Sequence, residues 1–195
     1  MAITISDKTN KKQQLLNSAL TLFVNRGIDA TSTASIAKHA GVATGTLFHH
    51  FATKEALVLA LYKKTKQEFS LQIAPFQLDK NKLKQQAKLV WDQAIDWGIV
   101  NADKQQFCRQ VSQYPKLSSE VRAEVLAEEF GSLALLIQFG QQHKIIADYP
   151  LAMMVDHAHS QYMSSTLYLI NHPKLVNDQV HREAIFEMFW KAFSL

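Results

Sequence analysis

Apolar residues recur at helical spacing along almost the whole chain. Between residues 9 and 26 they fall three or four positions apart, which places them on one face of an amphipathic helix. The same spacing returns in residues 54–73, 79–100, 103–113, 118–142, 151–170 and 177–193. Together with two short helices between residues 32 and 51, the pattern predicts an all-α protein of about nine helices and no strand.

The two short helices lie between Ser32 and Phe51 and are joined by a tight turn. The hydroxyl of Ser32 or Thr33 can accept a hydrogen bond from the first turn of the earlier helix and so cap it. Gly41 stands where that helix has to end, because glycine tolerates a positive φ. In the second helix, Leu47 and Phe51 are four positions apart and therefore mark its buried side.

The other side of this second helix carries small, flat or hydrogen-bonding groups. They are Thr44, Gly45, Thr46, Phe48 and His49. Such groups suit a helix that enters the major groove of DNA and contacts base edges there. The pattern therefore favours a helix-turn-helix DNA reader, with an ordinary two-helix corner of an all-α protein as the alternative.

The composition fits a helical protein with a packed core. Of 195 residues, 47% are hydrophobic and 19% charged, whereas only six are glycine and four proline, which disfavours a turn-rich β fold. Cys108 is the one cysteine, so an internal disulfide is excluded and a buried, inert thiol is expected. We see neither a secretory leader nor a membrane-spanning run, and expect a cytoplasmic protein without a membrane partner.

The charge is unevenly distributed along the chain. The net charge is +4, yet the residues up to Lys66 contain nine basic and three acidic side chains. A basic first third indicates that this end of the molecule faces a polyanion such as DNA. Solvated basic faces are common, so the asymmetry alone is a weak indicator.

The first sixty residues resemble the TetR/AcrR family of bacterial transcriptional repressors. Beyond them, only the number and length of the helices and the total size are similar. The matching residues, in order and at the family's spacing, are Leu15, Leu16, Ala19, Leu22, Phe23, Gly27, Thr31, Ile36, Ala37, Ala40, Gly41, Val42, Gly45, Thr46, Leu47, Phe51, Lys54, Glu55 and Leu57.

The resemblance implies a homodimer that binds a pseudo-palindromic double-stranded DNA operator and is released by a small-molecule effector. It implies a DNA-binding domain at residues 1–53 and an effector-binding and dimerisation domain at 54–195, linked by the helix from Lys54 to about Ile73. It also assigns DNA contacts. These are phosphate contacts by Ser32, Thr33 and Lys54, and groove contacts by Thr44, Gly45, Thr46, Phe48 and His49.

Two residues depart from the common family pattern. Ala43 stands where a serine usually caps the second helix, which forfeits about 1 kcal/mol. Phe48 stands where tyrosine is usual and has no hydroxyl for a phosphate. We therefore expect Phe48 to act by apolar contact, for example with a thymine methyl group.

A mostly apolar set in the larger domain could line the effector pocket. It consists of Trp91, Ile95, Phe107, Val111, Phe130, Leu133 and Ile137, with Arg109, Gln110 and Tyr162 as polar groups that would orient a ligand. The alternative for each apolar member is a place in the ordinary core.

Catalytic, cofactor and metal motifs are missing from the sequence, and we expect no cofactor and no metal. His157 and His159 are two apart and point to different sides of a helix, so they do not form a chelating pair. A helical enzyme, or an effector-binding protein without operator-specific regulation, remains the alternative from another class.

The last helix is apolar nearly all the way round, so it has to bury two faces. One face would lie on its own core and the other on a second copy of the chain, together with the preceding helix, in a two-fold four-helix interface. The predicted interface residues are Met154, Ala158, Tyr162, Ser165, Ile185, Phe186, Phe189 and Trp190.

Overall fold

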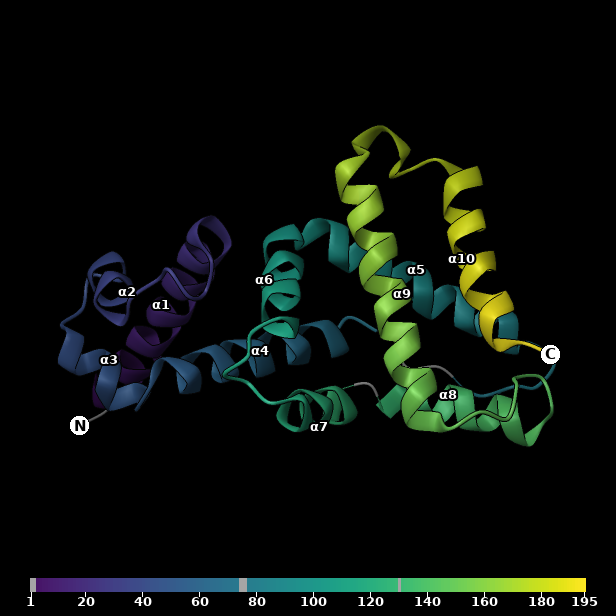
Figure 1. Ribbon diagram of the computed structural model, residues 1–195, viewed down its shortest axis with the longest axis horizontal. Coiled ribbons are helices and arrows are strands. Elements are labelled where there is room, and N and C mark those ends of the chain that lie inside the picture. Colours follow the sequence, from purple (N-terminus) through teal and green to yellow (C-terminus); the bar gives the residue numbers. More distant parts are fainter. Residues whose placement is uncertain (1–2, 74–76, 130) are drawn as a thin grey trace. The chain divides into compact units, whose positions relative to one another are not determined.

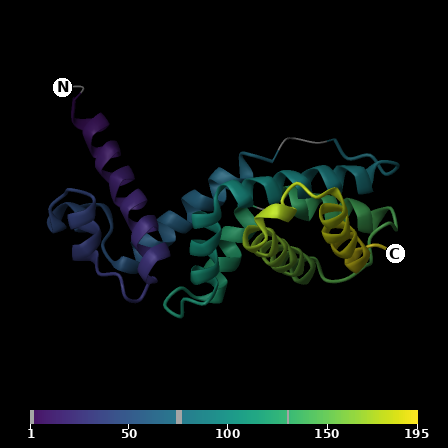
Figure 2. The same ribbon diagram turned by 90° about the horizontal axis from the view of Figure 1, so that it is seen from above.

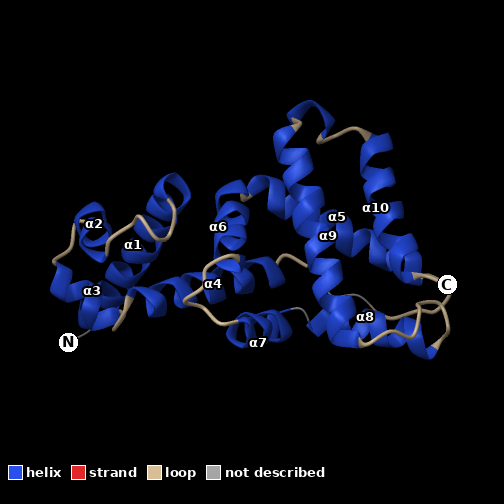
Figure 3. Ribbon diagram, in the orientation of Figure 1, coloured by secondary structure: helices blue, strands red, loops and turns tan. Residues whose placement is uncertain are grey.

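The computed structural model describes residues 3–73, 77–129 and 131–195, of which 3–9 and 126–129 are described by their backbone. Within these ranges the chain forms ten α-helices and one short 3-10 helix, and Figure 3 shows helices and loops alone. The sole strand-like feature in the described part is an isolated bridge between Ile146 and Ser194. The predicted all-α fold is confirmed.

The helices form two compact units. The first comprises the chain up to Lys66 together with Asp103–Glu124, and the second comprises Gln67–Ala102 together with Val125–Leu195. The first unit therefore extends past the expected boundary at residue 53 and includes a helix that we had assigned to the larger domain. Each unit is described separately below.

The first unit is built around three N-terminal helices, and three later ones complete it (Figure 1). These are α1 (Ile3–Arg26), α2 (Thr33–His39), α3 (Thr44–His50), most of α4 (Lys54–Ser70), α6 (Ala102–Ser112) and the start of α7 (Ser119–Glu129). Fully buried side chains from five of these helices form its core. They include Leu15, Phe23, Ile36, Leu47, Leu57 and Phe107.

Two glycines end the first two helices. Gly27 follows α1 with φ 86° and Gly41 follows α2 with φ 69°, a backbone region that side chains with a Cβ avoid. The buried hydroxyl of Thr31 donates to the Gly27 carbonyl over 2.8 Å. Ser32 then caps α2 by accepting from the Ser35 amide at 3.1 Å, as predicted.

The second unit consists of α5 (Leu83–Val100), α8 (Gly131–Gln142), α9 (Leu151–Asn171), the 3-10 helix Pro173–Leu175 and α10 (Gln179–Phe193). Helix α5 contacts α8, α9 and α10, and α9 also contacts α8 and α10, an arrangement visible in both Figures 1 and 2. Aromatic rings fill the space between them, with Trp91 and Phe189 stacked at 4.3 Å. None of the described helices is long and apolar enough to cross a membrane.

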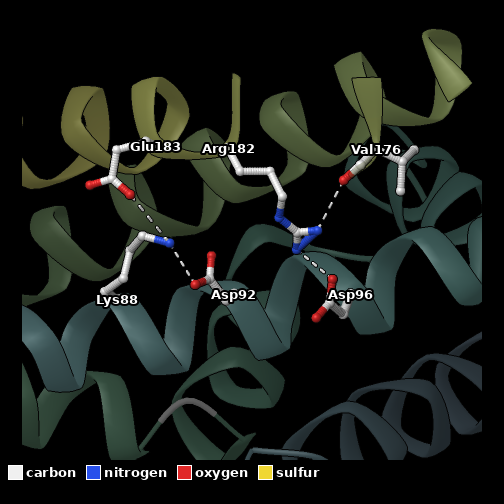
Figure 4. A network of polar contacts seen from close by, with 6 residues as sticks. All are labelled: Lys88, Asp92, Asp96, Val176, Arg182 and Glu183. Atoms are coloured by element: carbon white, nitrogen blue, oxygen red, sulfur yellow. Dashed lines mark hydrogen bonds and ion pairs between the residues drawn. The ribbon is translucent and has the colours of Figure 1, made fainter. Parts of the chain in front are cut away.

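Charged side chains join α5 to α10 on the surface of the second unit (Figure 4). Lys88 pairs with Asp92 at 2.6 Å and with Glu183 at 3.7 Å. Arg182 pairs with Asp96 and also donates to the Val176 carbonyl over 3.2 Å. These contacts fix the register of α10 against α5.

Several predicted helix boundaries were wrong. Helix α1 begins at Ile3 and α5 at Leu83, because Asp79 starts a turn in which its carboxylate accepts from the Asn81 amide. The single helix predicted at 118–142 is two helices, α7 and α8. Phe130, one of the predicted pocket residues, lies outside the described residues.

Candidate DNA-binding surface and effector cavity

Helix α3 presents almost its whole side-chain surface to solvent. Leu47 is its buried anchor, whereas Thr44, Gly45 and His49 are exposed and Phe48 is 48% exposed. A helix of seven residues that buries a single side chain contributes little to the core. Its exposed residues are therefore available for contact with another molecule.

The two departures from the family pattern have visible consequences in α3. Ala43 is its N-cap residue and supplies no side-chain hydrogen bond to the first turn. A large exposed aromatic ring such as Phe48 is unfavourable in water, so its position on this surface suits an apolar contact with a partner. Thr46, the remaining predicted groove residue, is half-buried.

The predicted phosphate-contacting residues lie at helix starts. Ser32 caps α2, Thr33 is its first residue, and Lys54 is the first residue of α4. The Lys54 ammonium donates to the Asp29 carbonyl over 3.1 Å. Partial burial lowers the pKa of Lys54, although the nearby Asp29 carboxylate opposes that shift. Lys54 thus joins the start of α4 to the loop before α2.

Helix α6 is attached to the C-terminal end of α1 by two amide side chains. Gln106 donates to the Val24 carbonyl over 3.1 Å, and Gln110 to the Phe23 carbonyl over 2.9 Å. The Phe23 and Phe107 rings stack with centroids 5.9 Å apart. The Phe23 carbonyl also accepts from the Gly27 amide at 2.8 Å, so Gln110 adds a second hydrogen bond to it. Gln106 bonds a carbonyl in the last turn of α1, where intrahelical partners are lacking.

The segment after α6 is joined to the start of α4. The Tyr114 hydroxyl donates to a Glu55 carboxylate oxygen over 3.2 Å, and Lys116 lies 3.5 Å from the same atom. A hydrogen bond from its own backbone, with these two partners, lowers the pKa of Glu55. Burial and the neighbouring Glu55 charge raise the pKa of Tyr114 to about 12. Lys54 and Glu55 therefore connect the start of α4 to two other segments of the unit.

The second unit contains an open cavity with an enclosed space of about 70 Å³. Its empty volume rises to about 690 Å³ when the open mouth is counted. Helices α4, α5, α8, α9 and α10 and the residues just after α4 line it. The lining residues are Phe69, Ser70, Ile73, Ala87, Val90, Trp91, Ala94, Ser132, Leu133, Leu136, Ala158, His159, Tyr162 and Phe189.

The N-terminal part of the chain matches a described protein family. Residues 15–61 fit the family described as bacterial regulatory proteins, tetR family. The transcriptional repressor KstR2 of Rhodococcus jostii is 45% identical over 53 residues, which cover 27% of this chain and 26% of KstR2. The match thus spans about a quarter of this curated relative.

Solved structures extend the similarity to the whole chain. A crystal structure of a TetR family transcription regulator from Shewanella sp. PV-4 is 41% identical, with a TM-score of 0.89, over 95% of this chain and 98% of that one. The chain belongs to the TetR family. A regulator from Marinobacter aquaeolei, 17% identical with a TM-score of 0.77 over 97% and 98% of the two chains, shares the fold.

Some of the residues predicted to form the effector pocket line the cavity of the second unit. Trp91, Leu133 and Tyr162 line it, whereas Ile95 and Ile137 are buried elsewhere in the core of the second unit. The members on α6 belong to the first unit and do not line this cavity. They are Phe107 and Val111, which are buried, Gln110, which contacts α1, and Arg109, which is exposed. Phe130 lies outside the described residues.

Most of the lining was missed at the sequence level. Ala87, Trp91 and Ala94 share one face of α5, and Ala158 and Tyr162 one face of α9. A small residue one helical turn from a large aromatic residue is the sequence signal that could have identified these positions. Phe69 and Ser70 of α4 carry no such signal, because their place in the cavity lining depends on which helices α4 contacts.

The predicted dimer interface requires correction. Six of its eight residues are buried in the core of their own chain, because the large rings on α9 and α10 pack against α5 and α8. They are Met154, Ala158, Tyr162, Phe186, Phe189 and Trp190. Ser165 and Ile185 are half-buried. The exposed stripe of α10 instead carries Val180, Ala184, Met188 and Ala192.

The remaining reactive side chains carry no site in the described ranges. Cys108 is buried, and burial raises the pKa of its thiol, which disfavours the reactive thiolate. His157 is exposed and His159 lines the cavity, so the two histidines face different surroundings. Among the described residues no group of three or more potential metal ligands is found.

Proposed function

We propose that this TetR family protein is a dimeric, effector-responsive DNA-binding repressor that acts in the bacterial cytoplasm. The observation that carries the proposal is the surface of α3, where Thr44, Phe48 and His49 are exposed on a helix anchored by Leu47. Capping by Ser32 and the turn at Gly41 support the helix in front of it. The name of KstR2 as a repressor favours repression over activation.

Two such helices on a symmetric dimer would enter successive major grooves about 34–36 Å apart. The operator is then pseudo-palindromic. Thr44 and His49 would contact base edges and Phe48 a thymine methyl group. Ser32, Thr33 and Lys54 would contact phosphates on either side of the reading helix.

The exposed stripe of α10 is our proposed dimer surface, in place of the buried rings. Val180 is 75% and Met188 73% exposed, and exposed apolar side chains four apart form a continuous stripe on a helix. On α9, Met153 is also an exposed apolar group. A second copy would cover these side chains in a two-fold four-helix interface.

Helix α4 provides the route for the response to effector. Its first residues, Lys54 and Glu55, are bonded within the first unit, and its last ones, Phe69 and Ser70, line the cavity of the second. An effector that binds better to the conformer without DNA lowers operator affinity by the same factor by which DNA lowers effector affinity. We propose domain roles on this basis, with DNA binding in the first unit and sensing in the second.

Operator binding measured over a range of salt concentrations tests the DNA assignment. Lys54→Ala should weaken binding to every sequence and reduce the salt slope by about one unit, because one phosphate contact is lost. Thr44→Ala and His49→Ala should instead change the preferred operator. Lys174→Ala removes the same charge in the second unit and serves as control. An unchanged slope in Lys54→Ala would contradict the phosphate contact.

Sedimentation at micromolar concentration tests the dimer surface. Met188→Glu should produce a monomer, because an ionised carboxylate at the centre of an apolar interface has no partner. Leu89, which is 53% exposed on α5, provides the control variant Leu89→Glu, which should remain dimeric. A dimeric Met188→Glu protein would exclude this stripe from the interface.

A further inference from the structure

Charge is almost absent from the described lining of the cavity in the second unit. The 14 described lining residues include no Asp, Glu, Lys or Arg, and His159 is the one whose side chain can become charged near neutral pH. An ion that enters such a site loses its hydration without a compensating partner, which is strongly unfavourable. The lining therefore selects against charged ligands.

The shape of the cavity is set by flat walls and by small residues that leave room between them. Trp91 and Phe189 form one stacked pair, with planes 22° apart. Phe69 and Tyr162 form another ring pair at 5.5 Å. Ala87, Ala94 and Ala158 contribute a single methyl group each where a larger residue would fill the space. A flat ring system fits between such walls, since offset or edge-on aromatic contacts are favourable.

Polar groups are few, and two of them lie on one helix. His159 and Tyr162 are three positions apart on α9, with ring centroids 6.4 Å apart. Ser70 of α4 and Ser132 of α8 add hydroxyl groups. An imidazole and a phenol can each donate to, or accept from, a ligand hydroxyl or carbonyl group. A small number of such groups in an apolar site fixes the orientation of the ligand.

We propose that this cavity takes an uncharged, flat aromatic molecule with a hydroxyl group, which His159 and Tyr162 orient by hydrogen bonds. This inference rests on the proposed function, since it names the chemical class of the effector for the same cavity. Aromatic stacking supplies the affinity, and the two α9 side chains distinguish a hydroxylated ring from the bare hydrocarbon.

Calorimetric titration of the full-length protein at pH 7 with four naphthalene probes tests the ligand class. The probes are 2-naphthol, naphthalene, 2-naphthoate and 2-naphthylmethylammonium, which share one ring system and differ in polar group and charge. We expect 2-naphthol to bind at least tenfold more tightly than either ion and three- to tenfold more tightly than naphthalene. Equal or tighter binding of either ion would overturn the proposal.

Variants on α9 test the orienting residues, with matched controls on the same helix. Tyr162→Phe and His159→Ala should each weaken 2-naphthol binding three- to tenfold and leave naphthalene binding nearly unchanged. Tyr168→Phe and His157→Ala remove the same groups from exposed positions and should change neither affinity. Loss of the preference for 2-naphthol in a control variant would contradict the assignment.

A filled cavity provides a test that does not depend on hydrogen bonds. Ala158→Leu should reduce binding of both 2-naphthol and naphthalene at least tenfold, whereas Ala152→Leu, at an exposed position of α9, should reduce neither. Circular dichroism checks that each variant folds, and Ala94→Val is the milder alternative. Undiminished binding to a folded Ala158→Leu or Ala94→Val protein would place the ligand elsewhere.

Operator affinity of the ligand-free protein separates this proposal from the proposed function. If the protein binds an operator and no probe prefers the cavity, the ligand class is wrong and the DNA assignment stands. If the probes bind as expected and operator binding is absent, the regulator assignment fails and the cavity assignment stands.

Discussion

The helix contacts compared below use different polar groups in the two units of this TetR family protein. In the first unit, Gln106, Gln110 and Lys54 donate to backbone carbonyls near helix ends. In the second unit, the contacts between α5 and α10 are pairs of charged side chains at the surface, such as Lys88 with Glu183 (Figure 4). A bond to a fixed backbone group constrains a helix more tightly than a pair of long side chains in water does.

The cores of the two units also differ in how closely they are packed. Phe23 and Phe107 are fully buried and stacked in the first unit, whereas Trp91 and Tyr162 border a cavity in the second. A closely packed core holds a reading helix in one geometry, as base recognition demands. A hollow core can adjust to a ligand. The difference between the units therefore matches the proposed division into a DNA-binding unit and an effector-binding unit.

The largest predicted effect concerns Phe107, which sequence reasoning had assigned to the effector pocket. Phe107→Ala removes a fully buried ring that stacks on Phe23, and should cost about 3–5 kcal/mol of stability. Because the lost contacts are in the first unit, we expect operator binding to collapse while 2-naphthol affinity stays unchanged. Denaturant unfolding and calorimetric titration measure the two effects.

Phe107→Leu is the milder companion variant, and should retain part of the operator affinity because leucine fills most of the same volume. A loss of 2-naphthol binding in a folded Phe107→Leu protein would show that the two units do not divide as described.

A smaller effect is expected from the charge network of the second unit. Arg182 is more buried than Lys84, with side-chain exposures of 15% and 49%, and it also donates to a backbone carbonyl. Arg182→Ala should cost about 1 kcal/mol and Lys84→Ala a few tenths. Denaturant unfolding at low and at high salt ranks the two variants, and equal losses would mean that the partial burial of Arg182 is irrelevant.

The sequence predicted the first unit far better than the second, for a physical reason. Gly41, Ser32 and Leu47 act within a few positions of themselves, through a turn, a cap and a helix face, so local spacing reveals them. The cavity depends on Phe69 of α4 and Phe189 of α10 meeting Trp91 of α5. Those residues are about 20 and about 100 positions from Trp91, and no local pattern contains them.

Most of the predicted interface residues lie in the core for a related reason. The last helix has more apolar residues than one face holds, and Phe186 and Trp190 could equally serve the core or an interface. Both rings are buried in the core of the second unit, where α10 contacts α5 and α9. Met188 and Val180 remained on the surface.

Acid should weaken the start of α10 specifically. Asp178 caps this helix, accepting from the His181 amide at 2.9 Å and lying 2.8 Å from its ring nitrogen. Hydrogen bonds from His181 lower the pKa of Asp178 below its ordinary 3.8. Its stabilising effect is therefore complete above pH 3.8 and is lost as the pH falls through the lowered value. Hydrogen exchange of α10 amides between pH 7 and 3 measures this loss.

Asp178→Asn is the matched variant, because an amide oxygen can still cap the helix and does not titrate. This variant should lack the weakening of α10, measured by hydrogen exchange, that acid causes in the wild type. The same acceleration in wild type and Asp178→Asn would assign the effect to other carboxylates.

A small stability change is expected at Gln110, where two opposite terms nearly cancel. Its Nε2 donates to the Phe23 carbonyl over 2.9 Å, whereas its buried Oε1 has no hydrogen-bond partner among the described residues. A rotated amide would place Oε1 against the carbonyl, so the orientation is fixed. The bond stabilises by about 0.5–1.5 kcal/mol and the unpaired oxygen costs about 1–3 kcal/mol.

Gln110→Met removes both groups at similar volume and should therefore leave the free energy of unfolding within about 1 kcal/mol of wild type. Gln106→Met, at an exposed position, loses a bond without relieving a buried oxygen and serves as control. If the link from α6 to α1 is retained for signalling, Gln110→Met should reduce the effector's influence on operator binding while stability holds. If the effector's influence on operator binding is unchanged, α6 holds the DNA-binding unit in place but does not transmit the response to effector.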